Sequence, residues 1–509
     1  MDCKLLEDEG TDERDDGDKP EDDQNVCGDG GKSEAAAGEA GEGGGEITNL
    51  VGVLSTTVGH YFPKFNDWLK GLTDIRDQAA ITYERQTLVW VGLLALVGKR
   101  GARMSITHDM RTENFGRNLK ELCGQDGLVS VPHGDTVEYL ATRLKAGELE
   151  ELPGKMVRSL LRGRVLERHR LFREYHTIAI DAVHIHTFDY AHCEHCLHCE
   201  DKSTGRKWWM HVKLQASLVT PTGLCLPVAC EWIENEPHYV KQDCETRACR
   251  RLLGKLRKMF PLLPVCVLLD GMYANQPMFD ALKEARMEWI VVFKEGAMSA
   301  IYKWVMDIKR ICGKNNVIVD RQEEEIEERK KRDHQERLVR GKPKHKKRLR
   351  VRETTYTWKK GVEYTPEPSR SLFNILTCRE TLDGKETCNY IWLVSDGLDL
   401  NEDTVKPLAN RGRCRWKIEN EGFNTQKNGG YRLEHLYSRD MVSMKVWCAL
   451  IDIAHLINQL IEKGSLIAAK SFGSIRAIAG KIFDHFQKYI FKKPADPPRI
   501  QIRLSWNTS

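Results

Sequence analysis

The change of pattern at Tyr175 constrains the fold of this chain more than any other feature. Three extended segments follow it, and Pro221-Thr222-Gly223 joins the last two in the manner of a hairpin; the segments are 176–186, 208–219 and 224–233. Helical and extended patterns then alternate, with helices predicted at 238–260 and 276–285 and strands at 265–269 and 289–293. An antiparallel meander that continues into a parallel crossover predicts an α/β fold, a mixed sheet with flanking helices.

The region before this change has a different periodicity. Apolar residues recur at helical spacing around 83–97, 136–144 and 156–166, which predicts an all-helical N-terminal domain over 47–174. Basic residues gather at its end, namely Arg158, Arg162, Arg164, Arg168, Arg170 and Arg173. Two interpretations stay open for them, contact with DNA phosphates or a solvated helix face.

The charge of the chain is divided unevenly. Residues 1–46 hold 17 acidic and 4 basic residues and almost no large apolar ones, so we expect a disordered acidic tail. The rest holds 74 basic against 57 acidic residues, which indicates a polyanionic partner. We find no run near the roughly 20 apolar residues of a membrane span; the longest, 88–97, predicts a buried helix. We expect a cytoplasmic protein without a signal peptide, whose 16 cysteines are thiols or metal ligands.

The α/β region is interrupted at 295–402. Nine of the sixteen residues from Arg337 to Arg352 are basic, which favours nonspecific phosphate contact over a merely solvated loop. Strands are predicted at 354–358, 371–379 and 387–394, so the interruption is a charged loop with a β-rich insertion. A long helix at 403–427 and an apolar helix at 441–461 return to the core, which then comprises 175–294 and 403–462; a basic tail region covers 463–509.

Two aspartates end predicted strands of the core. Asp181 ends the first strand and Asp270 the fourth, and these two strands can lie side by side in a sheet of this order. Carboxylates are ligands for hard divalent cations such as Mg²⁺, and paired ions promote in-line displacement at phosphorus. On the long helix Arg415 and Glu419 are four residues apart and share a face, which by itself is also typical of an exposed ion pair. Glu234, Glu236, Asp243 and Glu245 are interpreted as solvated or helix-capping residues.

Three pieces of sequence together resemble a known family. They are Ile178-Ala179-Ile180-Asp181, Leu268-Leu269-Asp270-Gly271-Met272-Tyr273-Ala274-Asn275 and Arg415-Trp416-Lys417-Ile418-Glu419-Asn420-Glu421-Gly422-Phe423-Asn424. In them the chain resembles the DDE transposases of bacterial insertion sequences, in the broad insertion-sequence-four group, over about 47–465. The helix signature of that group is Tyr, Arg, Glu and Lys at fixed spacing. Arg415 and Glu419 keep it, whereas Gly412 stands at the Tyr position and Gln426 at the Lys position, with Lys427 next to it.

The resemblance implies a ribonuclease-H-like core in which Asp181, Asp270 and Glu419 bind two Mg²⁺ or Mn²⁺ ions for DNA strand cleavage and strand transfer. Double-stranded DNA, as element ends and target, is the implied partner, bound by a homodimer. The residues assigned to DNA are Arg415, Lys427, Tyr273, Lys344, Lys346, Lys347 and Arg348. An inactive DNA-binding derivative and a metal-dependent nuclease or resolvase remain as alternatives.

A cluster of histidines and cysteines occupies 192–199. Cys193 and Cys196 have the C-x-x-C spacing typical of tetrahedral zinc, and Cys199 follows three residues later. The pairs Cys225 with Cys230 and Cys244 with Cys249 are poorly spaced as a second half of such a site. A structural zinc ion and free thiols in a loop are both open. His184 and His186 lie nearer to Asp181 and are expected to be ordinary strand residues.

Overall fold

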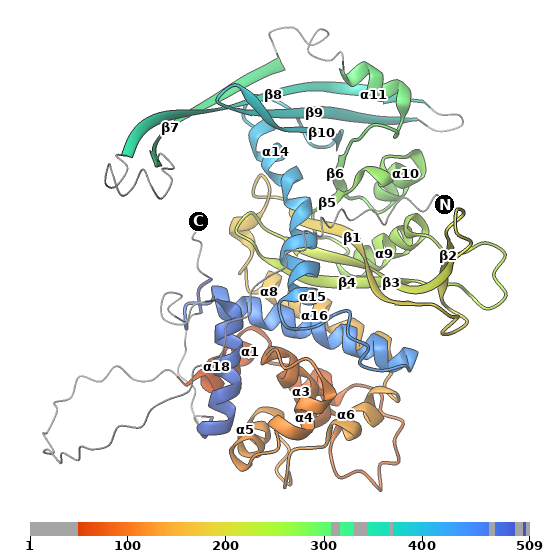
Figure 1. Cartoon of the computed structure of the whole chain (residues 1–509), viewed down its shortest axis with the longest axis vertical. Helices are drawn as coiled ribbons and strands as arrows, with labels where there is room; N and C mark the ends of the chain where they lie inside the picture. Colours follow the sequence, from red (N-terminus) through yellow and green to blue (C-terminus); the bar gives the residue numbers. More distant parts are fainter. Residues whose placement is uncertain are drawn as a thin grey trace, which may run out of the picture.

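The structure is a computed structural model that describes residues 49–306, 316–329, 345–365, 370–467, 474–493 and 502–504. The acidic tail predicted for 1–46 lies outside the described residues. The remaining elements form helical layers around one sheet, with the insertion at one end of the molecule and the N-terminal helices at the other (Figure 1).

The central part of the sheet has five long strands: β1 (His176–Phe188), β3 (Lys207–Val219), β4 (Cys225–Ile233), β5 (Val265–Leu269) and β6 (Glu288–Val292). β3 pairs antiparallel with both β1 and β4, whereas β5 is parallel to β1 and to β6. The resulting order, β4-β3-β1-β5-β6, is that of a ribonuclease-H-like core, so the predicted fold class is confirmed. A short strand that sequence reasoning assigned to a loop, β2 (Leu197–Glu200), pairs with β3 at the edge.

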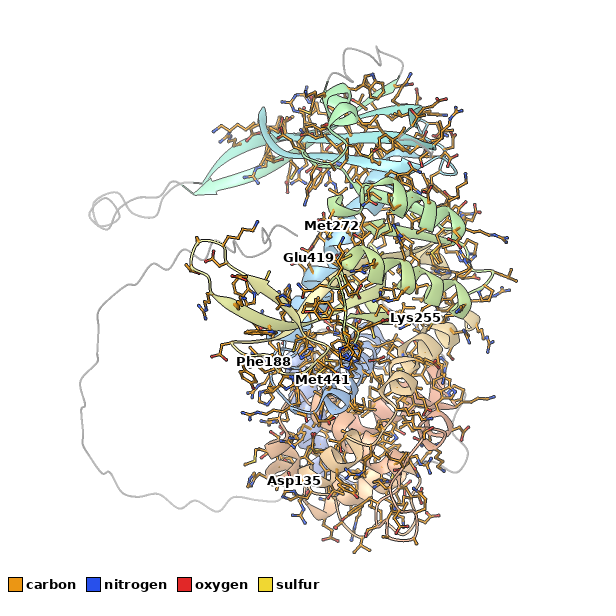
Figure 2. All side chains as sticks on the ribbon, turned by 90° about the vertical axis from the view of Figure 1, so that its right-hand side faces the viewer. Asp135, Phe188, Lys255, Met272, Glu419 and Met441 are labelled. Carbon is orange, nitrogen blue, oxygen red and sulfur yellow. The ribbon has the colours of Figure 1, made fainter. Side chains whose placement is uncertain are left out.

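Helices cover both faces of this sheet. α9 (Glu245–Met259) contacts β3 and β4 from one side, followed along the chain by α10 (Gln276–Glu284), while a helical run over 405–428 crosses the other side (Figures 1 and 2). α9 begins seven residues later than predicted. The cause is local, because the backbone N–H of Asp243 is held by the side-chain oxygen of Asn235 and the Asp243 carboxylate binds Arg251.

The expectation that no segment is long enough to cross a membrane is wrong for the apolar helix α16 (Met441–Lys463). By length and hydropathy this helix qualifies, but 83% of its most apolar window is buried inside the molecule. It also carries a buried ion pair, in which Lys213 of β3 lies 3.0 Å from Asp452, and Gln426 donates to the same carboxylate. Removing one partner of such a pair leaves an uncompensated buried charge. The contacts identify α16 as a core helix that is fixed to the sheet.

The insertion continues the same sheet. β10 (Lys385–Ser395) pairs antiparallel with β6, and β9 (Ser371–Leu382), β8 (His345–Tyr364) and β7 (Val317–Arg329) follow outward. The three predicted strands are therefore present but longer, and β7 is an addition. Its run of acidic residues does not have the alternation by which a half-buried strand is recognised. A short helix, α11 (Ser299–Met306), leads into this part.

The N-terminal part is helical, as its periodicity predicts. The predicted helices at 83–97, 136–144 and 156–166 are found as α3, α6 and α8, each starting within a few residues of its expected position. The elements are α1 (Leu50–Tyr61), α2 (Phe65–Lys70), α3 (Arg85–Val97), α4 (Arg103–Asp109), α5 (Glu113–Cys123), α6 (Gly134–Ala141), α7 (Ala146–Glu150), α8 (Leu152–Arg162) and the 3-10 turn η1 (Glu167–His169). α18 (Ile475–Lys488), from the predicted basic tail region, packs against α1 and α5.

Candidate active site

Asp181 lies in the middle of β1, not at its end as the sequence pattern suggested. β1 is paired with β5 only as far as Ala179 and Leu268, whereas its pairing with β3 continues to Phe188. The strand therefore extends past its parallel neighbour, and Asp181 lies level with the position where β5 has ended. Asp270 is the first residue after β5. The parallel register brings the two aspartates to the same edge of the sheet.

The third acid comes from the helical run over 405–428, which consists of α14 (Val405–Arg413), a 3-10 turn η4 (Cys414–Trp416), a π-helical segment η5 (Ile418–Asn424) and α15 (Thr425–Asn428). Arg415 of this run donates from Nη1 to Asp181 Oδ2 over 3.3 Å and from Nη2 to Glu419 Oε1 over 2.7 Å. Asp270 is within electrostatic range of the same guanidinium. The three carboxylates, named here the carboxylate site, thus gather around one cation.

The electrostatics of the site differ between the two aspartates. Burial raises the pKa of Asp181 to about 7, and the neighbouring carboxylates of Glu419 and Glu245 act in the same direction against Arg415. For Asp270 burial also favours the neutral acid, but the Gly271 N–H, Arg415 and Lys294 outweigh it and lower its pKa. Lys294 Nζ lies 3.2 Å from Asp270 Oδ1. The site therefore holds one carboxylate that is readily ionised, Asp270, and one that is only partly ionised near neutral pH, Asp181.

Glu245 is a fourth acid, which the sequence reasoning placed among solvated or capping residues. It is half-buried at the start of α9, accepts a hydrogen bond from the Tyr273 hydroxyl, and has a pKa raised by burial and by Asp270. Sequence alone offered one signal for it, an acid in the first turn of the helix that precedes the Asp270 strand. That signal is weak, since acids are common in first turns.

The family described as "Transposase DDE domain" matches residues 173–457, more than half of the chain. The chain belongs to this DDE transposase family. A comparison with curated proteins gives no match. Among solved structures, the cryo-EM structure of the piggyBac transposase synaptic complex with hairpin DNA is similar at 11% identity and a TM-score of 0.36, covering 87% of this chain and 82% of that one. Similarity at that level transfers no property to this transposase.

Members of this family generally use divalent metal ions, and the residues of this transposase fit such a cation. The available ligands are carboxylate oxygens, the type that Mg²⁺ and Mn²⁺ prefer. The position between Asp181 and Glu419 already attracts a positive group, the Arg415 guanidinium. Asp181, Asp270 and Glu419 supply carboxylate oxygens of this type around the Arg415 guanidinium.

Two groups of residues that the sequence analysis assigned to DNA contact, Tyr273 and the basic run around Arg348, have protein partners in this transposase. Tyr273 is fully buried and its hydroxyl donates to Glu245, so its side chain presents no surface for the predicted contact with DNA. Lys344 and the side chains of Lys346 and Lys347 lie outside the described residues. The backbone from 345 to 352 forms part of β8 and pairs with the acidic β7, with Arg350 opposite Glu324. Arg348 binds Asp383. Part of the basic run therefore lies in a strand opposite acidic residues of β7, and one of its arginines binds Asp383. The sequence pattern did not predict these acidic neighbours.

The remaining predicted DNA contact, Lys427, lies at the end of the helical run. Its ammonium binds Glu434 Oε1 over 2.7 Å and contributes, after burial, to the lowered pKa of His184 on β1. Gln426, which stands at the lysine position of the insertion-sequence-four helix signature, is buried against Asp452 instead. Between Glu419 and Lys427 runs the π-helical segment, whose hydrogen bonds span one residue more than those of an α-helix.

Proposed function

We propose that this protein catalyses metal-dependent DNA strand cleavage and strand transfer, as a transposase of the insertion-sequence-four-like group. The observation that supports this most is the gathering of Asp181, Asp270 and Glu419 around Arg415, from two strands and a helix of a ribonuclease-H-like sheet. Two divalent ions, when bound, would supply Lewis acidity and an activated oxygen nucleophile for displacement at phosphorus. No protein nucleophile is required for that chemistry.

The protein's own side chains have separate tasks in this proposal. Asp181 would hold an ion in its ionised form, and because its pKa is raised to about 7, the ionised fraction depends on pH near neutrality. Arg415 pairs with Asp181 and Glu419, and its guanidinium would pair with a DNA phosphate when those carboxylates hold a cation. Lys294, beside Asp270, adds positive charge at the same edge of the sheet.

Lys427 is proposed as a second phosphate contact, and the π-helical segment supports it. Seven residues of α-helix fall about 20° short of two full turns, so a lysine at 426 would share the face of Glu419. A π-helical turn takes up one additional residue. The eight-residue separation of Glu419 from Lys427 across η5 then corresponds to the seven-residue separation of an uninterrupted helix. The shifted lysine thereby regains the face that the family signature requires.

The experiment that tests the activity uses purified protein, Mn²⁺ or Mg²⁺, and DNA carrying the ends of the encoding element. Asp181→Asn, Asp270→Asn and Glu419→Gln are each expected to abolish cleavage while DNA binding persists in a gel-shift assay. Glu421→Gln, on the same helical run, is the matched control and should cleave normally. Cleavage by any of the three variants would refute the site assignment.

The same reactions separate the proposal from its alternatives. Joining of cut ends to a target plasmid is the result expected of a transposase, and analytical ultracentrifugation of the DNA complex is expected to show two protein chains. Cleavage without joining would indicate a nuclease or resolvase. DNA binding without cleavage by the unaltered protein would indicate an inactive derivative.

A further inference from the structure

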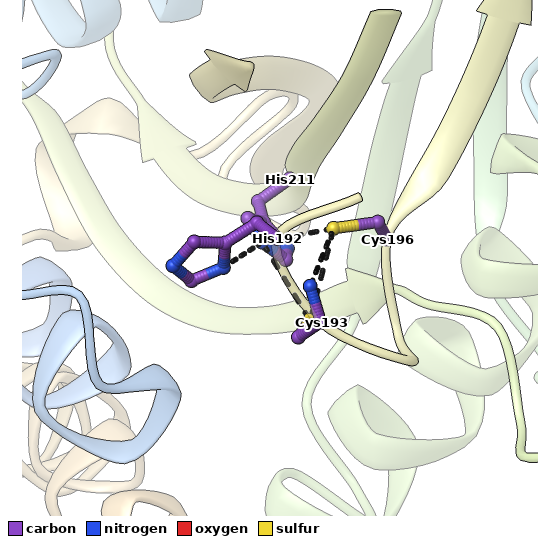
Figure 3. A group of neighbouring side chains, drawn as sticks. All are labelled: His192, Cys193, Cys196 and His211. Atoms are coloured by element: carbon purple, nitrogen blue, oxygen red, sulfur yellow. Dashed lines mark hydrogen bonds between the residues drawn. The ribbon is translucent and has the colours of Figure 1, made fainter. Parts of the chain in front are cut away.

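Four side chains lie close together beyond the C-terminal end of β1, away from the carboxylate site. His192 and Cys193 follow the strand, Cys196 precedes β2, and His211 lies on β3, where it pairs in register with His186 (Figure 3). One atom from each, a ring nitrogen or a sulfur, lies within 4.8 Å of all the others. His192, Cys193, Cys196 and His211 are named here the His/Cys cluster. It includes two of the three cysteines that the sequence pattern suggested as zinc ligands, and Cys199 on β2 is outside it.

Four of the six separations within the cluster match those of tetrahedral zinc ligands. Bonds of about 2.3 Å to sulfur and 2.0–2.1 Å to nitrogen place two sulfurs about 3.8 Å apart, sulfur and nitrogen about 3.5 Å, and two nitrogens about 3.3 Å. The sulfurs of Cys193 and Cys196 are 3.7 Å apart. His211 Nε2 lies 3.8 Å and 3.5 Å from these sulfurs and 3.3 Å from His192 Nδ1. Each of these four distances is within 0.3 Å of its tetrahedral value.

The distance between the sulfurs of Cys193 and Cys196, 3.7 Å, excludes a disulfide bond between them. A disulfide requires sulfurs about 2.05 Å apart, and both Cys193 and Cys196 are free thiols. Two thiolates with two imidazoles in a tetrahedron are ligands for zinc, whereas Mg²⁺ and Mn²⁺ favour the oxygen ligands of the carboxylate site. With four protein ligands the coordination is closed, the arrangement of a structural ion.

The loop that carries three of these residues is held in shape by its surroundings. The buried Asn235, between β4 and α9, donates from its side chain to the Cys196 carbonyl and from its backbone to the His195 carbonyl. The backbone N–H of Cys193 donates to the Cys196 sulfur. Phe188 stacks on the His192 ring, with ring centroids 4.4 Å apart, and fixes its plane. A preformed set of ligands lowers the ordering cost of metal binding.

We propose that His192, Cys193, Cys196 and His211 bind one structural zinc ion that fastens the end of β1 to β3. The ion would close the β1–β2–β3 extension, which otherwise has a loop and a short edge strand between two long strands. This site is separate from the catalytic metals in ligand type and position, and it stands whether or not the protein cleaves DNA.

The test is the zinc content of the full-length protein, purified without chelator and measured by mass spectrometry. About one zinc ion per chain is expected, falling to about none in Cys196→Ser and in His211→Ala. Cys388→Ser, a partly exposed free cysteine on β10, is the matched control and should keep its zinc. Asp181→Asn should also keep its zinc, since it lies in the other metal site.

A second measurement protects the test against variants that fail to fold. Unaltered protein refilled with Co²⁺ should show the intense visible absorption of a tetrahedral ion and a thiolate-to-metal charge-transfer band. Both signals should be lost in His192→Ala, whose ligand is on the loop. Unaltered protein that contains no zinc and gives no thiolate band with Co²⁺ would overturn the proposal, as would unchanged zinc in Cys196→Ser.

Discussion

The carboxylate site includes a residue of β1, the His/Cys cluster lies just beyond the end of that strand, and the two share no type of ligand. The first is made of oxygens from β1, the end of β5 and a helix, is partly open, and already holds the Arg415 cation. The second is made of sulfurs and ring nitrogens from one loop and β3, and its His211 is fully buried. An open charged site suits a reaction with an anionic substrate, whereas a closed site suits an ion that only holds structure.

The largest expected effect comes from a substitution that disrupts the carboxylate site and leaves the His/Cys cluster intact. Asp270→Asn should lower DNA cleavage by at least about 10³-fold, because a metal ligand and its charge are lost together. Its zinc content should equal that of unaltered protein. Cleavage rate and zinc content, measured on the same preparation, check this. Loss of both would mean that the two sites are not independent.

Removing zinc should affect stability before chemistry. An ion present at about 1,000 times its dissociation constant stabilises the folded state by about 4 kcal/mol. A zinc-selective chelator should therefore lower the melting temperature of unaltered protein but not that of Cys196→Ser, as measured by scanning calorimetry. An equal effect on both would place the stabilising ion elsewhere.

The next effect concerns pH and the carboxylate site alone. The folded-state pKa of Asp181 is raised to about 7, above its unfolded value, so the group favours folding below about pH 4 and this contribution is lost as pH rises to about 7. Asp181→Asn should thus gain stability relative to unaltered protein over that window, by about 1–3 kcal/mol at pH 8. Urea unfolding in Mg²⁺-free buffer at pH 5 and pH 8 measures it. A difference that does not change with pH would contradict the raised pKa.

The smallest effect tests the π-helical segment. Lys427→Ala should weaken DNA binding to a modest extent and reduce the slope of log affinity against log salt by about one phosphate contact. Lys417→Ala, on the same helical run with its ammonium over the Trp416 ring, serves as the control. Fluorescence anisotropy at several salt concentrations measures both. Equal slopes for Lys427→Ala and unaltered protein would remove Lys427 from the DNA contacts.

Much of the core could be predicted because its signals are local. The extended runs around Asp181 and Asp270 and the helix between them follow from apolar pattern and turn residues. The structure has the strands within a few residues of their predicted bounds, whereas α9 begins seven residues late. Strand β7 was missed because Glu323, Glu324 and Glu325 lack the alternation that marks a half-buried strand. Its partner is the basic β8, with Arg350 opposite Glu324, and the two strands belong to segments that are read separately in the sequence.

The site was predictable in part for the same reason. Asp181, Asp270, Arg415 and Glu419 stand in recognisable local contexts, whereas Glu245 and the burial of Tyr273 depend on how α9 packs against the sheet. The one-residue shift from Gln426 to Lys427 looked unfavourable in an α-helix. The π-helical segment, which the sequence pattern does not reveal, supports the proposed contact of Lys427 with DNA.

The sequence by itself determined the alternation of strands and helices, the acids that follow or occupy those strands, and the C-x-x-C spacing of Cys193 and Cys196. These depend on neighbours within a few residues, where steric and hydrophobic preferences act directly. Only the tertiary structure decided that Asp181 lies inside its strand, that Arg415 joins the carboxylates, and that His211 completes the His/Cys cluster. Fifteen residues separate Cys196 from His211. Antiparallel pairing of β1 with β3 brings His211 to the cluster, and no local preference records that pairing.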